Sequence, residues 1–363
     1  MQSNRPSIRR SPGKRGRCAL ACAAAAFVVL QIGLAVAIEF WLPDLRDPAY
    51  GVKLRVLKHR VTVGATQQPM VLMGGSSRVE YGLLGQPLEQ QLAEELGTRP
   101  VVFNFGITAG GALTQLLVIN RLVGEGIRPD LMLVEVFPPN LSVNTGLNEL
   151  PRLTPERLWL DELPLLANFG ARPLPELRVE WWQGWPAPSY SHRHAILTRL
   201  APLFLPGGVV AISSSRFDDS GMGPTFTCPR SPEEHQHAVA ATIAQYRPWF
   251  HEFRLGGACC DALRETLRLC RREHIGAALV LMPEATEYRD TLYSPESWAQ
   301  IEAFVADLSR EFDVPVINAR DWVPSDEFAD GHHLIAAGAE RFTERLGREH
   351  LAPLLRGTRP ALP

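Results

Sequence analysis

MVLMGGSSR, residues 70–78, is the stretch of the sequence that decides the fold. Residues 70–73 form an apolar run of the length expected for a buried strand, and a turn with two glycines and two serines follows. Four more apolar runs come later, at residues 101–105, 131–136, 277–282 and 314–318. Segments with helical spacing separate them, at residues 84–96, 113–122, 257–273, 298–308 and from 335. This alternation predicts a doubly wound, three-layer α/β/α domain with five parallel strands.

The region between the third and fourth predicted strands breaks the alternation. Residues 138–230 are rich in proline and tryptophan and show no sustained period. We therefore predict an irregular insertion, at about residues 141–250, within the α/β domain. Its aromatic residues suit either of two roles, which are to bind a substrate or to pack the insertion onto the sheet.

The N-terminal segment predicts one membrane span. Residues 18–38 carry no charge over 21 positions, enough for a helix to cross a hydrocarbon core of about 30 Å. Basic residues precede this run, acidic residues follow it, and Trp41 lies at the expected interface, so the positive-inside rule places the N-terminus in the cytoplasm. The alternative is a cleaved signal peptide, with Ala35-Val36-Ala37 at the cleavage site, and a secreted protein.

These patterns divide the chain into five parts. They are a basic cytoplasmic tail (1–17), a transmembrane signal-anchor (18–42), a juxtamembrane segment (43–67), an extracytoplasmic α/β domain (68–350) and a C-terminal tail (351–363).

Composition excludes several classes of protein. The chain has 363 residues, of which 45% are hydrophobic and 21% charged, so it is neither a disordered chain nor a multi-span membrane protein. The net charge is −2, and six basic residues lie in the first 17 positions, which leaves about −8 on the remainder. An acidic body is poorly suited to bind nucleic acid. The four cysteines outside the predicted span allow one disulfide and require none.

Two loops carry the residue types of nucleophilic catalysis. Ligands bind beyond the carboxyl ends of the strands in a doubly wound sheet, and Ser76 and Ser77 directly follow the first strand. A serine attacks only when a base takes its proton and a further group orients that base. Asp330 and His333 lie three residues apart in the loop after the last strand, at the same edge. The alternative for the serines is an ordinary turn that caps the next helix.

With these two blocks the chain resembles the SGNH/GDSL hydrolase superfamily, in particular its divergent, membrane-anchored cell-envelope branch. The resemblance implies a flavodoxin-like sheet, Ser77 as nucleophile, His333 as base and Asp330 as the orienting acid. It also implies an oxyanion hole from the Ser77 N–H and from Ala109 or Gly110 in the turn at residues 104–111. The family's third block is altered here to Phe-Pro-Pro-Asn at residues 137–140, and Asn140 supplies a side-chain amide one position late.

Other polar residues have less specific assignments. Arg78 suits binding of an anionic or carbonyl group of the substrate, and a surface ion pair explains it equally well. Glu135 lies within an apolar strand and needs a partner if it is buried. His192 and His194 lack the acid or cysteine that would complete a metal site. The sequence implies no metal and no cofactor.

We therefore expect a membrane-anchored, extracytoplasmic serine esterase or O-acyltransferase acting on acyl esters of a carbohydrate or other envelope polymer. Water as acceptor gives hydrolysis, and a sugar hydroxyl gives transfer. The alternative is a non-catalytic binding or assembly protein of the envelope on the same fold, because a fold alone does not confer a function.

Overall fold

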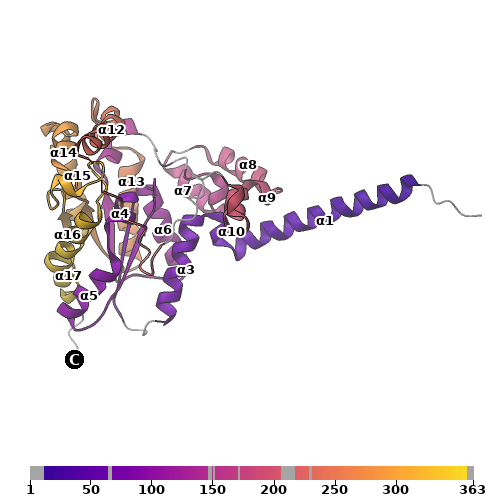
Figure 1. Cartoon of the computed structure of the whole chain (residues 1–363), viewed down its shortest axis with the longest axis horizontal. Coiled ribbons are helices and arrows are strands. Elements are labelled where there is room, and N and C mark those ends of the chain that lie inside the picture. Colours follow the sequence, from indigo (N-terminus) through magenta and orange to yellow (C-terminus); the bar gives the residue numbers. More distant parts are fainter. Residues whose placement is uncertain are drawn as a thin grey trace, which may run out of the picture.

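The computed structural model describes residues 12–63, 68–145, 149, 152–170, 172–205, 217–228 and 231–357. The greater part of the predicted basic tail and the last six residues of the predicted C-terminal tail lie outside these residues. Figure 1 shows an α/β body from which one long helix, α1, projects.

The sheet has five parallel strands in the order β2-β1-β3-β4-β5. The strands are β1 Met70–Gly75, β2 Val101–Gly106, β3 Leu131–Val136, β4 Gly276–Leu281 and β5 Val316–Asn318. The predicted fold class is confirmed, with each strand displaced by at most two residues. The chain reverses its direction across the sheet between β1 and β3, and in such sheets a ligand crevice opens at that point.

Helices cover both faces of the sheet. The α-helices of the described residues are α1 Pro12–Phe40, α2 Pro43–Arg46, α3 Pro48–Val63, α4 Ser77–Gly82, α5 Gly85–Leu96, α6 Ala112–Gly124, α7 Leu163–Asn168, α8 Leu174–Gly184, α9 Pro188–Ser191, α10 Arg193–Leu200, α12 Pro232–Phe250, α13 Ala258–Arg272, α14 Thr286–Leu292, α15 Pro295–Phe312, α16 Ala336–Leu346 and α17 Ala352–Gly357.

Strand side chains alternate between two hydrophobic cores, as the pleat requires. Leu72 of β1 belongs to the core under α3, α6, α13 and α15. Its neighbours Val71 and Met73 point into the core under α5, α12, α14 and α16. A strand buried on both faces is expected to be continuously apolar, which explains why the runs were recognisable in the sequence.

The segment predicted as juxtamembrane is part of the folded body. Helix α3 buries Tyr50, Leu54 and Leu57 against the sheet, at the spacing of one helix face. Lys53 on the same helix is fully buried and donates hydrogen bonds to two main-chain carbonyls, Asn104 O at 3.1 Å and Gly221 O at 2.6 Å. These bonds tie α3 to the sheet and to the part of the insertion that precedes α12.

The predicted insertion is more regular than its sequence indicated. Before α12, the described residues of the insertion contain four short α-helices, α7 to α10, interrupted by prolines before a hydrophobic period can build up. Its last part is the 19-residue helix α12, which Ser231 caps through its hydroxyl and which begins with Pro232. In Figure 1, α7 to α10 gather beside the root of α1, whereas α12 lies above the sheet.

Helix α1 includes the predicted span. Its stretch Gly16–Phe40 is long and apolar enough to cross a membrane, a property that a signal sequence shares. All six cysteines are free thiols.

Candidate active site

Ser77 and His333 meet at the carboxyl edge of the sheet, although 256 positions separate them in the chain. Ser77 begins α4 directly after β1, and His333 lies in the loop that leads into α16. Ser77 Oγ is 2.8 Å from His333 Nε2. This distance is within the range over which a base takes a proton from a nucleophile.

Asp330 holds the other side of the His333 ring. Its Oδ2 is 2.7 Å from His333 Nδ1, and its Oδ1 accepts the His333 main-chain N–H at 2.9 Å. Gly331 between them has a φ of +92°, a conformation that favours glycine. Burial acts to raise the pKa of Asp330, but the hydrogen bond to His333 and the charges of His332 and His333 outweigh it and hold the pKa well below its usual range. The acid therefore stays ionised next to the ring.

A residue of the insertion covers one face of the His333 ring. Phe226 stacks on it with ring centroids 4.4 Å apart and an angle of 24° between the planes. Phe226 in turn packs edge-on against Tyr81 of α4. The ring is thus fixed by a hydrogen bond at Nδ1 and by stacking on its face. No feature of the sequence near Phe226 predicted this contact.

Ser76 and Ser77 have different surroundings. Ser76 is the buried N-cap of α4, and its hydroxyl accepts the Arg78 N–H at 3.2 Å. Its own N–H and hydroxyl donate to Glu135 on β3, at 2.5 and 3.1 Å. The capping role proposed for the serine turn therefore belongs to Ser76, and Ser77 directs its hydroxyl to His333.

Buried charges lie beneath the serine turn. Arg78 is 2% exposed, donates to two main-chain carbonyls that follow β4, and lies 3.6 Å from Glu284 and 3.9 Å from Glu135. Glu284 also binds Arg320 at 2.7 Å. A surface ion pair was the wrong expectation for Arg78. Arg78 is one of the residues that line the cleft beside Ser77, and two of its guanidinium nitrogens, Nε and Nη1, have no hydrogen-bond partner among the described residues.

Glu135 is the buried acid of an apolar strand, and its partners are Ser76 and Arg78. Burial raises the pKa of Glu135, whereas the charge of Arg78 and the hydrogen bonds from Ser76 oppose that rise. Gln115 of α6 pins the same position by bonding both to the main-chain N–H and to the carbonyl of Glu135. The acid therefore couples β3 to the turn that carries the nucleophile.

The residues predicted for an oxyanion hole lie around Ser77. Ala109 and Gly110 follow β2, Asn140 follows β3, and all three line the same cleft as Ser77. The Gly110 N–H donates to Ile107 O at 2.8 Å within its turn. The Ala109 residue is exposed and has a φ of +57°, and no described residue accepts its N–H. The geometry therefore favours Ala109 over Gly110 as the main-chain donor of this turn.

The cleft beside Ser77 has a volume of about 230 Å³. Helix α12 forms one of its walls with Gln245, Tyr246 and Trp249. None of these three residues was predicted from the sequence. A signal was present, because the buried positions 239, 242, 243 and 246 of α12 follow helical spacing.

His332 lines the same cleft as Ser77, and its ring lies next to that of His333, with the two centroids 4.0 Å apart. It is buried, its ring contacts Tyr246 and Tyr288, and burial together with the charge of His333 holds its pKa well below the usual range. Asp330, His332 and His333 offer metal-binding atoms within 4.8 Å of one another. Both ring nitrogens of His333 already have hydrogen-bond partners, so we assign the group to proton transfer. His192 lies elsewhere, beside Arg46 in a cavity at the root of α1.

Comparisons with known proteins give the following result. No protein-family model matches the chain. No curated protein matches it. Solved structures do, among them a lipase/acylhydrolase from Enterococcus faecalis, with 12% identity, a TM-score of 0.36 and coverage of 78% of this chain and 95% of that one.

Two further solved structures are esterases. A carbohydrate acetylesterase family member from Sinorhizobium meliloti has 12% identity, a TM-score of 0.33 and coverage of 80% and 98% of the two chains. A variant of an acetyl-xylooligosaccharide esterase from Geobacillus has 12% identity, a TM-score of 0.34 and coverage of 81% and 96%. The strand order establishes the fold independently of these likenesses.

Proposed function

We propose that this chain is a membrane-anchored, extracytoplasmic serine esterase or O-acyltransferase that acts on acyl esters of a carbohydrate or other envelope polymer. The observation that carries the proposal is the continuous hydrogen-bonded arrangement of Ser77, His333 and Asp330 at the crevice of the sheet. A nucleophile, a base and an acid that orients the base are the three parts required for acyl transfer through a serine.

The first half of the reaction forms an acyl-serine. As Ser77 Oγ attacks the acyl carbon, His333 Nε2 takes the serine proton, and Asp330 stabilises the resulting imidazolium through Nδ1–H. The carbonyl oxygen becomes negative and faces the N–H groups of Ser77 and Ala109 and the amide of Asn140. Each such donor contributes about 3 kcal/mol to transition-state stabilisation. His333 then gives its proton to the departing alcohol.

The second half of the reaction releases the acyl group. His333 takes a proton from the incoming acceptor as the acceptor oxygen attacks the acyl carbon, and it returns that proton to Ser77 Oγ as the bond between Ser77 and the acyl group breaks. Water yields a free acid, and a sugar hydroxyl yields a new ester. The wall formed by Gln245, Tyr246 and Trp249 offers an amide and aromatic rings, groups suited to hold a sugar next to the acyl-serine.

The test uses the full chain in detergent with p-nitrophenyl acetate as substrate. We expect turnover by the native protein and a loss of about 10³-fold or more in kcat for Ser77→Ala and His333→Ala, because both remove a reacting group. His237→Ala is the matched control, since this exposed histidine of α12 does not line the cleft. Equal background release by the native protein and Ser77→Ala would instead favour a non-catalytic binding protein.

A second assay separates transfer from hydrolysis. Adding a soluble oligosaccharide to the reaction gives two products that mass spectrometry distinguishes, the free acid and the acylated sugar. A product ratio that rises with oligosaccharide concentration supports transfer, and a ratio that stays at zero supports hydrolysis.

A further inference from the structure

The last third of α1 is packed against the insertion. Phe27 and Val29 are more than half exposed, whereas Gln31, Ala35 and Ile38 are each at most 4% exposed. The change begins inside the apolar stretch that is long enough to cross a membrane. Any segment that packs on this part of α1 therefore lies in the same environment as α1 itself.

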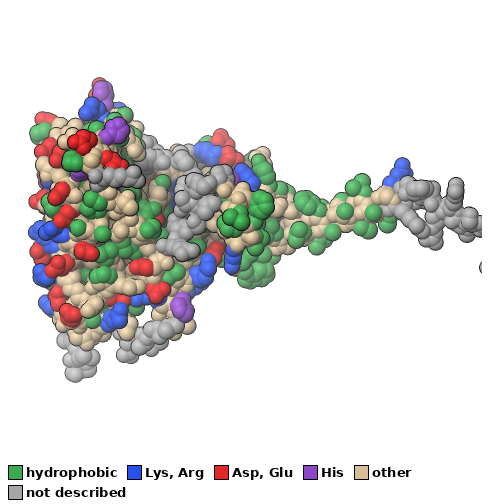
Figure 2. All heavy atoms as spheres, viewed as in Figure 1, with side chains coloured by type: hydrophobic (Ala, Val, Ile, Leu, Met, Phe, Trp, Pro, Cys, Tyr) green, Lys and Arg blue, Asp and Glu red, His purple; other side chains and the backbone are tan. Residues whose placement is uncertain are grey.

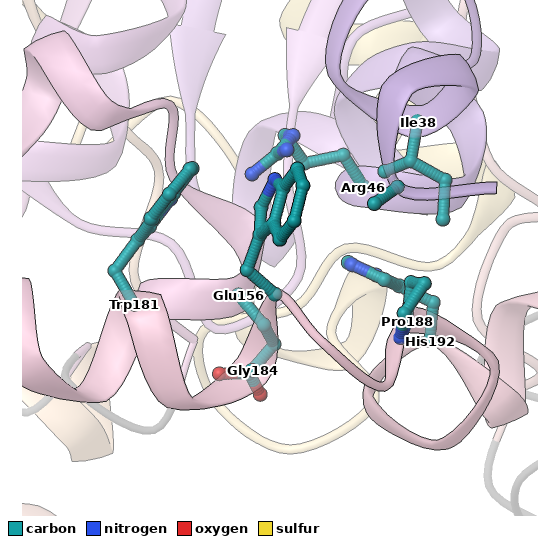
Figure 3. Close-up of a pocket in the computed structure, with 9 residues that line it drawn as sticks. Ile38, Arg46, Glu156, Trp181, Gly184, Pro188 and His192 are labelled. Carbon is teal, nitrogen blue, oxygen red and sulfur yellow. The ribbon is translucent and has the colours of Figure 1, made fainter. Parts of the chain in front are cut away.

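Helix α9 and its neighbours form that cover. The Ser189 N–H donates to Gln31 Oε1 at 3.2 Å, and Trp159 Nε1 donates to the Glu39 carbonyl at 3.2 Å. Figure 3 shows Ile38 of α1 directed into the same small cavity as Pro188 and His192 of the insertion. The polar side chain of Gln31 within the apolar helix thus receives its partner from the insertion, as a buried polar group requires.

The contact between Ser189 and Gln31 fixes the position of α9 along the axis of α1. Gln31 lies nine residues before the end of α1 at Phe40, which corresponds to about 13 Å along a helix. The bilayer core is about 30 Å thick. If α1 spans the bilayer, α9 therefore lies at the depth of the outer leaflet and not above it.

The outer surface of the same region is apolar. Its strongly exposed hydrophobic side chains are Val179, Trp182, Tyr190, Leu200, Leu203 and Phe204, and Phe40 and Trp41 are exposed at the end of α1. The six residues of the insertion belong to α8, α9, α10 and the 3₁₀ helix η5 (Pro202–Phe204). Helix α9 packs on α1 and on α10, α10 packs on η5, and a hydrogen bond from Ser191 Oγ to Gly184 O joins α9 to α8. Figure 2 shows hydrophobic side chains gathered where α1 meets the body. A gathering of this kind marks an interaction surface.

The charged neighbours of this surface suit a lipid interface. Arg193 lies over the Tyr190 ring, 4.3 Å from its centroid, and the Arg199 side chain is about half exposed. Tryptophan, tyrosine and arginine side chains collect where hydrocarbon meets lipid headgroups. Leu203 is 97% exposed and Phe204 82% exposed. Exposure of these apolar side chains to water is unfavourable, and their transfer into lipid is favourable.

We propose that α8, α9, α10 and η5 form a membrane seat, a surface that enters the outer leaflet beside α1 and holds the α/β body in one orientation on the membrane. The occupant is the lipid bilayer, because the seat continues the lipid-facing surface of α1. The inference rests on the membrane location in the proposed function and adds to it a second, lateral membrane contact.

The test uses photo-crosslinking in the full chain. p-Benzoylphenylalanine replaces one residue at a time, at Phe204, Tyr190, Phe27 and Glu302, and the protein is reconstituted in vesicles of phosphatidylcholine and phosphatidylglycerol. Phe27 on α1 reports the anchor, and Glu302, exposed on α15 away from α1, is the matched negative control. We expect lipid adducts at Phe204, Tyr190 and Phe27 and at least tenfold fewer at Glu302.

The other outcomes overturn the inference in separable ways. Adducts at Phe27 alone would show an anchored protein without a seat. Adducts at Phe204 and Tyr190 to a second copy of the chain, in place of lipid, would assign this surface to self-association. Absence of lipid adducts at all four positions would overturn the anchor as well, whereas the esterase assay would be unaffected by any of these results.

Discussion

The two neighbouring serines after β1 have different roles, since Ser76 supports the structure of the turn and Ser77 is the proposed nucleophile. Ser76 points into the protein, where it caps α4 and binds Glu135, and Ser77 points into the cleft toward His333. Fixing the first residue constrains the second, because they are consecutive in one turn. Nucleophiles that are held by a buried neighbour lose little entropy when they react.

Asp330→Asn tests the orientation of His333. The amide leaves the geometry nearly intact, but it no longer carries the charge that stabilises the imidazolium, and it favours the wrong tautomer. We expect kcat for p-nitrophenyl acetate to fall by about 10³-fold or more with little change in KM. The comparison is Asp326→Asn, an acid in the same loop that does not contact the ring. A loss of less than tenfold for Asp330→Asn would show that another group orients His333.

Glu135→Gln and Glu135→Ala test the positioning of the nucleophile turn. Gln retains an acceptor for Ser76, and Ala leaves two buried donors without a partner, at a cost of about 1–3 kcal/mol each. We therefore expect Glu135→Ala to slow acylation of Ser77 by about tenfold or more at temperatures where it is folded, with partial rescue in Glu135→Gln. Equal acylation rates in folded Glu135→Ala and native protein would restrict Glu135 to a role in stability.

The proposed reacting residues could be predicted from the sequence, but the contacts that hold them in place could not. The serine turn and the loop with Asp330 and His333 were predicted to share one edge of a parallel sheet, and the resemblance to the SGNH/GDSL superfamily implied Ser77 as the nucleophile. The partner of Glu135 depends on the register of β3 beside β1, and the burial of Arg78 depends on β4, so neither follows from local spacing. The contact between Phe226 and His333 depends on where a long insertion returns to the sheet.

At the scale of elements, helix α12 links the insertion to the cleft. Its buried face packs into the core with α14 and α16, and Gln245, Tyr246 and Trp249 border the cleft. Helix α12 was not predicted, because a proline- and tryptophan-rich region precedes it, although Ser231, Pro232 and two glutamates form a helix start. Helix α3 was overlooked for a similar reason, since its position next to a predicted span favoured a linker.

Trp249→Ala tests α12 as a substrate-binding wall. Loss of an aromatic contact worth about 0.5–1.5 kcal/mol should raise KM for an acylated oligosaccharide by about twofold to twelvefold. The small substrate p-nitrophenyl acetate should show a smaller effect, and kcat should change little for either. Trp182→Ala, at an exposed tryptophan of α8, is the matched control. Equal effects of Trp249→Ala on both substrates would argue against a role in sugar binding.

At the scale of the whole molecule, α1, α3 and the insertion form one connected unit with the sheet. Lys53 joins three of these parts through its bonds to Asn104 O and Gly221 O. Burial lowers the pKa of Lys53 to about 8, against the opposing charges of Glu80 and Asp218. The Lys53 side chain thus links these parts through hydrogen bonds, and burial disfavours its charged form.

Lys53→Met tests this cross-link through the pH dependence of stability. The Lys53 side chain of the unfolded chain titrates near pH 10.4, so between about pH 8 and that value the unfolded chain binds a proton that the folded protein has released. The free energy of unfolding contributed by Lys53 therefore rises with pH across this window. Thermal unfolding in detergent at pH 7 to 10 should show this rise in the native protein and in Lys58→Met, an exposed control on the same helix, but not in Lys53→Met. The same slope in all three proteins would contradict the assignment.

The central claim is that Ser77 is a nucleophile activated by His333, and labelling with a fluorophosphonate probe followed by peptide mass spectrometry tests it most directly. The account predicts a single modified peptide with the phosphonate on Ser77, and a loss of labelling in folded His333→Ala. Modification of a different serine, or undiminished labelling of Ser77 in His333→Ala, would contradict it.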